Sequence, residues 1–259
     1  MPLLPLDRHQ WAELGLGEIS MTVETREPIW PTYLANEDVQ KALAIADEFD
    51  VWTESSGLHS LALNDQATYQ ERMAIVAFLM VHEHQRSMIK LLEFSLAGSA
   101  ATLMRPAFEA YARGLWLLHA SDAQMEHFRS GGSQDVERLI RTVAKLTKDE
   151  KFAFLLDTWE QSKRSLHGFV HGSYQSLLRR TRDIDFPESE VADMLRFMTG
   201  MALHATLEML GLAQRRTPHA DRALHSVLIE VLRRDVVLKL YRMDLALVAH
   251  PAMEGDETT

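Results

Sequence analysis

The segment from Ser162 to Arg182 carries the residues of this chain that are best suited to bind an anion. It reads SKRSLHGFVHGSYQSLLRRTR and contains no acidic residue, although the whole chain has a net charge of −10. Side chains that recur every three, four or seven residues share one face of a helix. The binding residues that we predict here are Arg164, His167, His171, Gln175, Arg179 and Arg182. Arginine, histidine and glutamine in such a stripe are typical of a surface that binds phosphate or RNA backbone.

Arg164 and His171 also have the spacing of an Arg–His pair that cleaves RNA. Six residues separate them, which matches the R-x(4–6)-H spacing of HEPN-type helical ribonucleases. In that chemistry the cation stabilises the scissile phosphate and the histidine moves a proton, without a metal. If the chain is an enzyme, we therefore expect a metal-independent endoribonuclease. The alternative is an arginine on a helix surface and a histidine that packs near Gly172.

A second set of charged residues, Arg105, Glu109 and Arg113, interrupts an otherwise apolar segment at intervals of four. This spacing predicts a ladder of charges along one helix face. One interpretation is a structural network that fixes helix packing, because buried charges must be paired. The other is a polar site that faces His171 across a helical bundle, in which Glu109 is catalytic and both arginines bind the substrate.

These two segments resemble uncharacterised bacterial helical families of the DUF5677 and DUF6988 type. The resemblance rests on Arg105-Pro-Ala-Phe-Glu109-Ala-Tyr-Ala-Arg113-Gly-Leu-Trp116 and on the later Leu166-His-Gly-Phe-Val-His171-Gly172, within residues 70–215. In layout these families are similar to HEPN and abortive-infection proteins, which implies RNA cleavage or a role in phage defence. By motif match, the residues that carry over are Arg105, Glu109, Arg113, Arg164 and His171. Gly168 departs from the HEPN pattern, because it is predicted to bend the helix between Arg164 and His171.

Metal and cofactor sites are not expected in this chain. The absence of cysteine excludes thiolate ligands and disulfides. His167 and His171 have the i, i+4 spacing of shared metal ligands, as do His204 and Glu208, but E-x-x-H does not occur in the sequence. We therefore predict neither a metal nor a cofactor, and keep a helical metalloprotein as a third hypothesis.

The elements that must position these residues are predicted to be helices with short connections. Asn36 is expected to cap the first one, Gly98-Ser99 to end the second, and Pro106 either to kink the third or to place its start near Arg105. The second helix is predicted to bury a stripe that includes Met73, Val76 and Met80. The predicted helices cover residues 36–52, 66–96, 100–120, 122–130, 134–147, 148–180 with interruptions at Gly168 and Gly172, 188–215 and 219–249.

The sequence predicts an all-α protein of 259 residues, built as a bundle of four to five long helices with short accessory helices. Residues 1–35 are expected to form an irregular N-terminal arm, 36–250 the bundle, and 251–259 a disordered acidic tail. The N-terminus lacks a signal peptide and no segment is apolar enough to span a bilayer, so we predict a cytoplasmic protein without membrane contact.

Two functions remain open from the sequence. The first is a binding or structural module with a protein partner, in a defence or stress-response system. The second is the HEPN-like ribonuclease, with RNA bound along the basic stripe. For either function we expect a homodimer, because wide apolar helix faces favour symmetric association.

Overall fold

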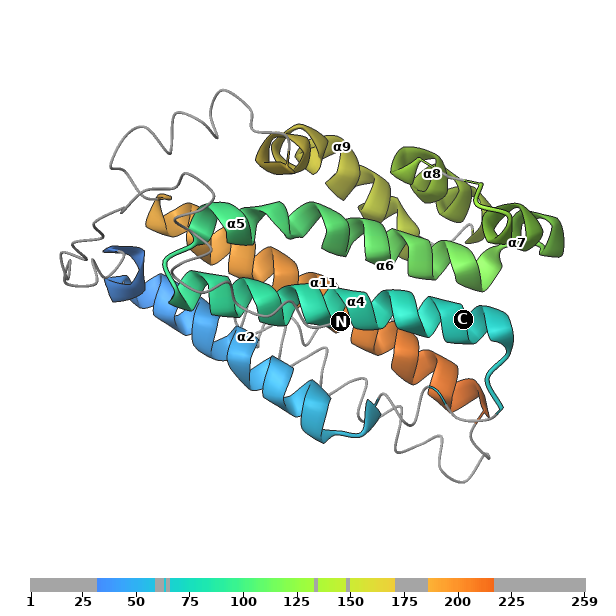
Figure 1. Ribbon diagram of the computed structural model, residues 1–259, viewed down its shortest axis with the longest axis horizontal. Coiled ribbons are helices and arrows are strands. Elements are labelled where there is room, and N and C mark those ends of the chain that lie inside the picture. Colours follow the sequence, from blue (N-terminus) through green and yellow to red (C-terminus); the bar gives the residue numbers. More distant parts are fainter. Residues whose placement is uncertain are drawn as a thin grey trace, which may run out of the picture. The chain divides into compact units, whose positions relative to one another are not determined.

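The computed structural model describes residues 32–58, 63, 66–132, 135–147, 150–170 and 186–216, and all regular structure within them is helical (Figure 1). The predicted all-α bundle is therefore confirmed. The chain divides into two compact units, Met1–Trp30 and Pro31–Thr259, and every described residue belongs to the second unit. The helices are η1 (Thr32–Ala35), α2 (Glu37–Ser55), α4 (Tyr69–Glu93), α5 (Ala97–Thr102), α6 (Met104–His119), α7 (Asp122–Arg129), α8 (Val136–Thr147), α9 (Glu150–Val170) and α11 (Glu188–Arg216). The predicted helix 219–249 and the tail 251–259 lie outside the described residues.

Side-chain caps fix where the first two long helices begin. The Asn36 side chain accepts hydrogen bonds from the backbone N–H groups of Asp38 and Val39, as the sequence predicts. Thr68 caps α4 in a reciprocal box with Glu71, so α4 begins at Tyr69. Each cap satisfies backbone donors that a helix start leaves without partners. The cap thereby fixes the first residue of the helix and, with it, which side chains face the core.

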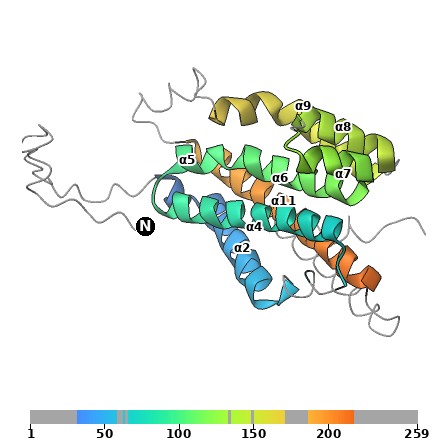
Figure 2. The same ribbon diagram turned by 45° about the vertical axis from the view of Figure 1, so that its right-hand side comes forward.

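α4 lies at the centre of the described bundle and packs against α2, α6 and α11 (Figures 1 and 2). Its buried face is built on Ile75, Phe78, Val81 and Ile89. The predicted stripe is wrong for Val76 and Met80, whose side chains are 45% and 42% exposed. The reason is that the true buried face includes two polar residues, His82 and Gln85, which a hydropathy pattern assigns to solvent.

The connection between α4 and α6 differs from the sequence prediction. The break falls at Ser95, which has a φ of 63°, and not at Gly98-Ser99, which lie inside α5. The backbone N–H of Leu96 donates to the carbonyl of Leu91, and that of Ser95 donates to Leu92. This is the pattern of a Schellman stop, in which one left-handed residue closes a helix.

α6 begins at Met104, so the second of the two outcomes predicted for Pro106 is the one observed. Pro106 lies in the first turn, where a missing N–H costs nothing. α6 runs between α4 on one side and α8 and α9 on the other (Figure 1). Phe108 stacks on Trp159 of α9 and on Phe197 of α11. This packing places the charged residues of α6 beside α9.

Among the described helices, none combines the length and the apolar composition needed to cross a bilayer.

Candidate functional site

The charged residues of α6 form a partly exposed stripe. The Arg105 Nε donates a hydrogen bond of 2.8 Å to Glu109 Oε1, one turn further along the helix. The two side chains are 25% and 29% exposed. Arg113, the third predicted member, is half-buried and makes no hydrogen bond or ion pair with any described residue. The ladder that the spacing predicts is therefore half formed, as one ion pair with a second arginine beyond it.

α9 supplies the next member of this group, His167. The Arg105 Nη1 lies 2.8 Å from the Nδ1 of His167, and arginine can only donate, so the imidazole accepts at Nδ1. This assigns the neutral tautomer with its proton on Nε2 to the imidazole. Glu109, Arg105 and His167 thus form one chain of polar contacts, which we call the α6–α9 network. It joins two helices that are 62 residues apart at this contact.

Apolar packing beside the α6–α9 network holds α9 in place. Leu166 is buried next to the exposed His167, and Trp159 is buried against Phe108 two turns earlier. Because α9 is anchored through this face, its opposite face carries exposed Arg164 one turn before His167. Lys163 is already paired with Glu160, so Arg164 is the cation of this turn that has no ion pair among the described residues.

The other residues predicted in the basic segment lie outside the described part of the chain. These are His171, Gln175, Arg179 and Arg182. The Arg164–His171 pair and the predicted site facing His171 therefore stay predictions. One element of that prediction is wrong, because α9 runs through Gly168 as helix as far as Val170. The residue that α9 brings to Arg105 is His167.

Within the described residues, no three His, Asp or Glu side chains come together as metal ligands. His204 and Glu208, which have metal-ligand spacing in the sequence, lie on α11 beside Tyr111. The rings of His204 and Tyr111 are 6.0 Å apart, and burial together with the charge of Glu208 raises the pKa of Tyr111 well above its ordinary value. Tyr111 belongs to the buried core, and His204 and Glu208 are partly buried.

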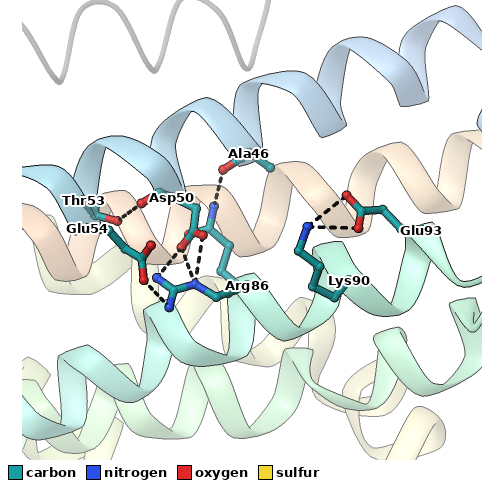
Figure 3. A network of polar contacts seen from close by, with 8 residues as sticks. Ala46, Asp50, Thr53, Glu54, Arg86, Lys90 and Glu93 are labelled. Atoms are coloured by element: carbon teal, nitrogen blue, oxygen red, sulfur yellow. Dashed lines mark hydrogen bonds and ion pairs between the residues drawn. The ribbon is translucent and has the colours of Figure 1, made fainter.

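A second polar network, which sequence reasoning missed, joins α2 to α4 (Figure 3). The guanidinium of Arg86 donates to both carboxylate oxygens of Asp50 at 2.9–3.2 Å and also pairs with Glu54. The Asp50 side chain is only 10% exposed. The hydrogen bonds to Asp50, followed by the charges of both carboxylates, raise the pKa of Arg86 although burial opposes this. We call this group the α2–α4 network.

Buried polar side chains continue from the α2–α4 network toward α11. Gln85 donates to the carbonyl of Ala46 at 3.3 Å and to the hydroxyl of Thr199 at 3.4 Å. One turn earlier, His82 Nε2 lies 3.2 Å from the hydroxyl of Thr206. The only sequence signal for this layer is a polar residue at a core position of α2, where Asp50 directly follows Phe49.

Comparison with known proteins identifies a family for this chain. Residues 78–228, more than half of the chain, match the model of a family of unknown function, DUF6988. This span contains the whole α6–α9 network and Arg164, but it does not include α2. No curated protein and no solved structure matches the chain.

Proposed function

The chain belongs to the DUF6988 family, whose function is unknown, and we propose that it is a helical binding module that recognises an anionic group of a protein partner. The observation that carries this proposal is the guanidinium of Arg105, which Glu109 and His167 hold in one orientation on a partly exposed surface. A fixed guanidinium loses less side-chain entropy when it binds a carboxylate than a free one does. The site is therefore preorganised for recognition.

Arg164 adds a second positive charge to this surface. It is exposed, lies one turn from His167, and makes no ion pair with any described residue. A guanidinium in water keeps all its donors available, and it binds a carboxylate with two parallel hydrogen bonds. Arg105 provides a guanidinium in a fixed orientation, and Arg164 provides a positive charge that no described carboxylate offsets. Together they suit one carboxylate or a short acidic segment.

A protein partner fits this surface better than RNA does. Glu109 offsets the charge of Arg105, and Glu160 offsets that of Lys163. RNA binding gains its affinity from many phosphate contacts at once. The net charge of −10 also opposes the approach of a long polyanion. A single carboxylate faces neither difficulty, because it needs only the local pair of arginines.

Binding of a fluorescent poly-glutamate peptide at low ionic strength, followed by anisotropy, tests this proposal. We expect the wild type to bind it, and Arg105→Gln and Arg164→Gln each to weaken binding by about tenfold, the loss of one charge-assisted contact. The matched control is Arg138→Gln, which removes from α8 an exposed arginine that makes no ion pair with the described residues. Equal weakening by the control would mean that the peptide follows overall charge, and the proposal would then fail.

A metal-independent ribonuclease is the second candidate, and two observations favour keeping it. Arg164 is exposed where a phosphate can reach it, and α9 continues unbroken through Gly168 toward His171. In this candidate Arg164 stabilises the phosphate, His171 moves the proton, and Glu109 assists. A role in defence or stress response rests on the resemblance to abortive-infection proteins.

Expression of the wild type and of His171→Ala in a bacterial host distinguishes the two candidates. A ribonuclease predicts slowed growth and fragmented RNA with the wild type only. If both chains are harmless and purified wild type leaves RNA intact without metal, the ribonuclease is rejected and the binding module stands.

A further inference from the structure

One side of α4 carries exposed apolar side chains at both of its ends. Val76 and Met80 are 45% and 42% exposed, and Phe94, the C-cap residue of α4, is 74% exposed. Met80, Ser87 and Phe94 follow one another at intervals of seven residues, which is about two helix turns, so they lie on one side of the helix. Exposed apolar residues that gather on one side mark interaction surfaces, whereas isolated ones do not.

This side of α4 faces away from α6 and α11. α4 contacts α6 through Phe78, α11 through Gln85 and α2 through Arg86. By the helical period, Phe78 and Gln85 point to the side opposite Ser87. Arg86 is turned from Ser87 by a little more than a quarter of a turn. We call the exposed side the α4 outer face. It consists of Val76, Met80, Glu83, Ser87, Lys90 and Phe94, which are all exposed.

Two opposite charges border the α4 outer face along one edge. Glu83 and Lys90 are seven residues apart, and by the helical period both are turned from Ser87 toward the side of Arg86. The Glu83 side chain makes no hydrogen bond or ion pair with any described residue. Lys90 is 56% exposed and pairs with Glu93 on its own helix (Figure 3). This edge therefore presents one unpaired negative charge and one exposed positive charge.

We propose that the α4 outer face binds the same face of a second copy of this chain, with the two α4 helices antiparallel. The two-fold axis lies between the helices and perpendicular to them, at the level of Ser87. Serine is small, so the two helices can approach closely where they meet. Met80 and Phe94 each lie seven residues from Ser87, so Met80 of each copy packs on Phe94 of the other.

Charge complementarity is the reason for choosing a second copy as the partner. An axis perpendicular to the helices keeps each edge of the face against the same edge of the second copy. Glu83 lies four residues before Ser87, and Lys90 lies three residues after it. Glu83 is therefore level with Lys90 of the second copy to within one residue, a rise of about 1.5 Å. The axis that joins the apolar residues thus also pairs these charges twice, which is the self-complementarity that a symmetric interface requires.

Sedimentation of the full chain over a range of concentrations gives the first test. We expect a weak dimer, with a dissociation constant on the order of micromolar, because one pair of helices forms a small interface. Met80→Glu should raise this constant by at least about tenfold, because it places a carboxylate against the ring of Phe94. Val51→Glu is the matched control, since Val51 is 57% exposed on α2, outside the face. Equal weakening by both variants overturns the proposal.

Charge reversal gives the second and sharper test. Glu83→Lys places like charges at both contacts, and so does Lys90→Glu, so each variant alone should dimerise at least about tenfold more weakly than the wild type. An equal mixture of the two variants restores both opposite-charge pairs, and we expect heterodimers about as stable as the wild-type dimer. Lys41→Glu is the matched control, because Lys41 is also 56% exposed and pairs with Glu37 on its own helix, α2. We expect this control to dimerise as the wild type does.

Three outcomes overturn the proposal outright. The first is a wild type that stays monomeric at every concentration. The second is a mixture of the charge-reversal variants that associates no better than either variant alone, although both chains are helical by circular dichroism. The third is a Lys41→Glu chain that dimerises as weakly as Lys90→Glu, because association would then follow the net charge of the chain and not this face.

Discussion

The α2–α4 network and the α6–α9 network both join helices through an arginine, but they differ in how far water reaches the carboxylate that the arginine binds. In the first, Asp50 is 10% exposed and accepts from Arg86 through both oxygens. In the second, Arg105 and Glu109 are 25% and 29% exposed and share one hydrogen bond. Loss of the partner is costly for a buried carboxylate, because no water replaces the lost hydrogen bonds. A carboxylate that stays hydrated loses little stability in the same way.

This difference separates a structural role from a binding role. In the α2–α4 network Arg86 is 40% exposed, but its guanidinium is already committed to two carboxylates, those of Asp50 and Glu54. In the α6–α9 network Arg105 binds one carboxylate and one imidazole and is 25% exposed, and α9 carries exposed Arg164 one turn before His167. We infer that the first network holds α2 on the bundle and that the second presents a charge. Substitutions in the two networks should therefore differ in their cost, and the largest cost is expected at Asp50.

Replacement of Asp50 by alanine should lower the free energy of unfolding by about 2 kcal/mol. The change removes the carboxylate that binds Arg86 and leaves a space beside Phe49 in the face between α2 and α4. Arg86 is 40% exposed and keeps Glu54, so we expect less than the full cost of an isolated buried charge. Urea unfolding followed by circular dichroism measures this difference.

Asp193→Ala is the control for this prediction, because Asp193 is 74% exposed and also pairs with an arginine, Arg196. We expect it to cost less than about 0.5 kcal/mol. If Asp50→Ala and Asp193→Ala proved equally mild, burial would not distinguish the two networks and the contrast would be lost.

Replacement of Arg105 by alanine should cost less, about 0.5–1 kcal/mol, because its partners remain hydrated. Combining Arg105→Ala with His167→Ala in a double-mutant cycle isolates the contact between α6 and α9. We expect a coupling energy below about 1 kcal/mol in unfolding, together with a clear loss of peptide binding. A coupling as large as that of Asp50 with Arg86 would show that this network is also structural.

Much of the fold follows from local sequence rules. The caps at Asn36 and Thr68 and the early position of Pro106 depend on residues within a single helix turn, which a sequence displays directly. The end of α4 at Ser95 cannot be predicted in this way. A glycine in the sequence indicates a possible positive φ, whereas a serine does not. Gly98 was predicted to break the helix because glycine often does so, but it lies inside α5.

The candidate site was harder to predict because its contacts cross between helices. The Arg105–Glu109 pair could be anticipated, since one helix supplies both residues. The contact of Arg105 with His167 depends on the packing of Phe108 against Trp159, and no spacing along the chain encodes that. The same holds for Arg86 and Asp50. The sequence predicts an apolar buried face for α2, and Asp50 was not expected to belong to it.

The smallest expected effect concerns His84, a half-buried polar group on α4. Burial lowers its pKa, and the nearby charge of Glu83 partly opposes this. The unfolded chain therefore binds a proton more readily, so this contribution to stability is lost as pH falls below about 6.5, the ordinary histidine value. Between pH 7.5 and 5, the free energy of unfolding should fall by less than about 1 kcal/mol in the wild type and by a smaller amount in His84→Gln.

Glu83→Gln should make this fall larger, because it removes the charge that favours the protonated ring. If Glu83→Gln flattened the profile instead, the acid sensitivity of α4 would arise elsewhere, and partial burial would not be the cause of the lowered pKa of His84.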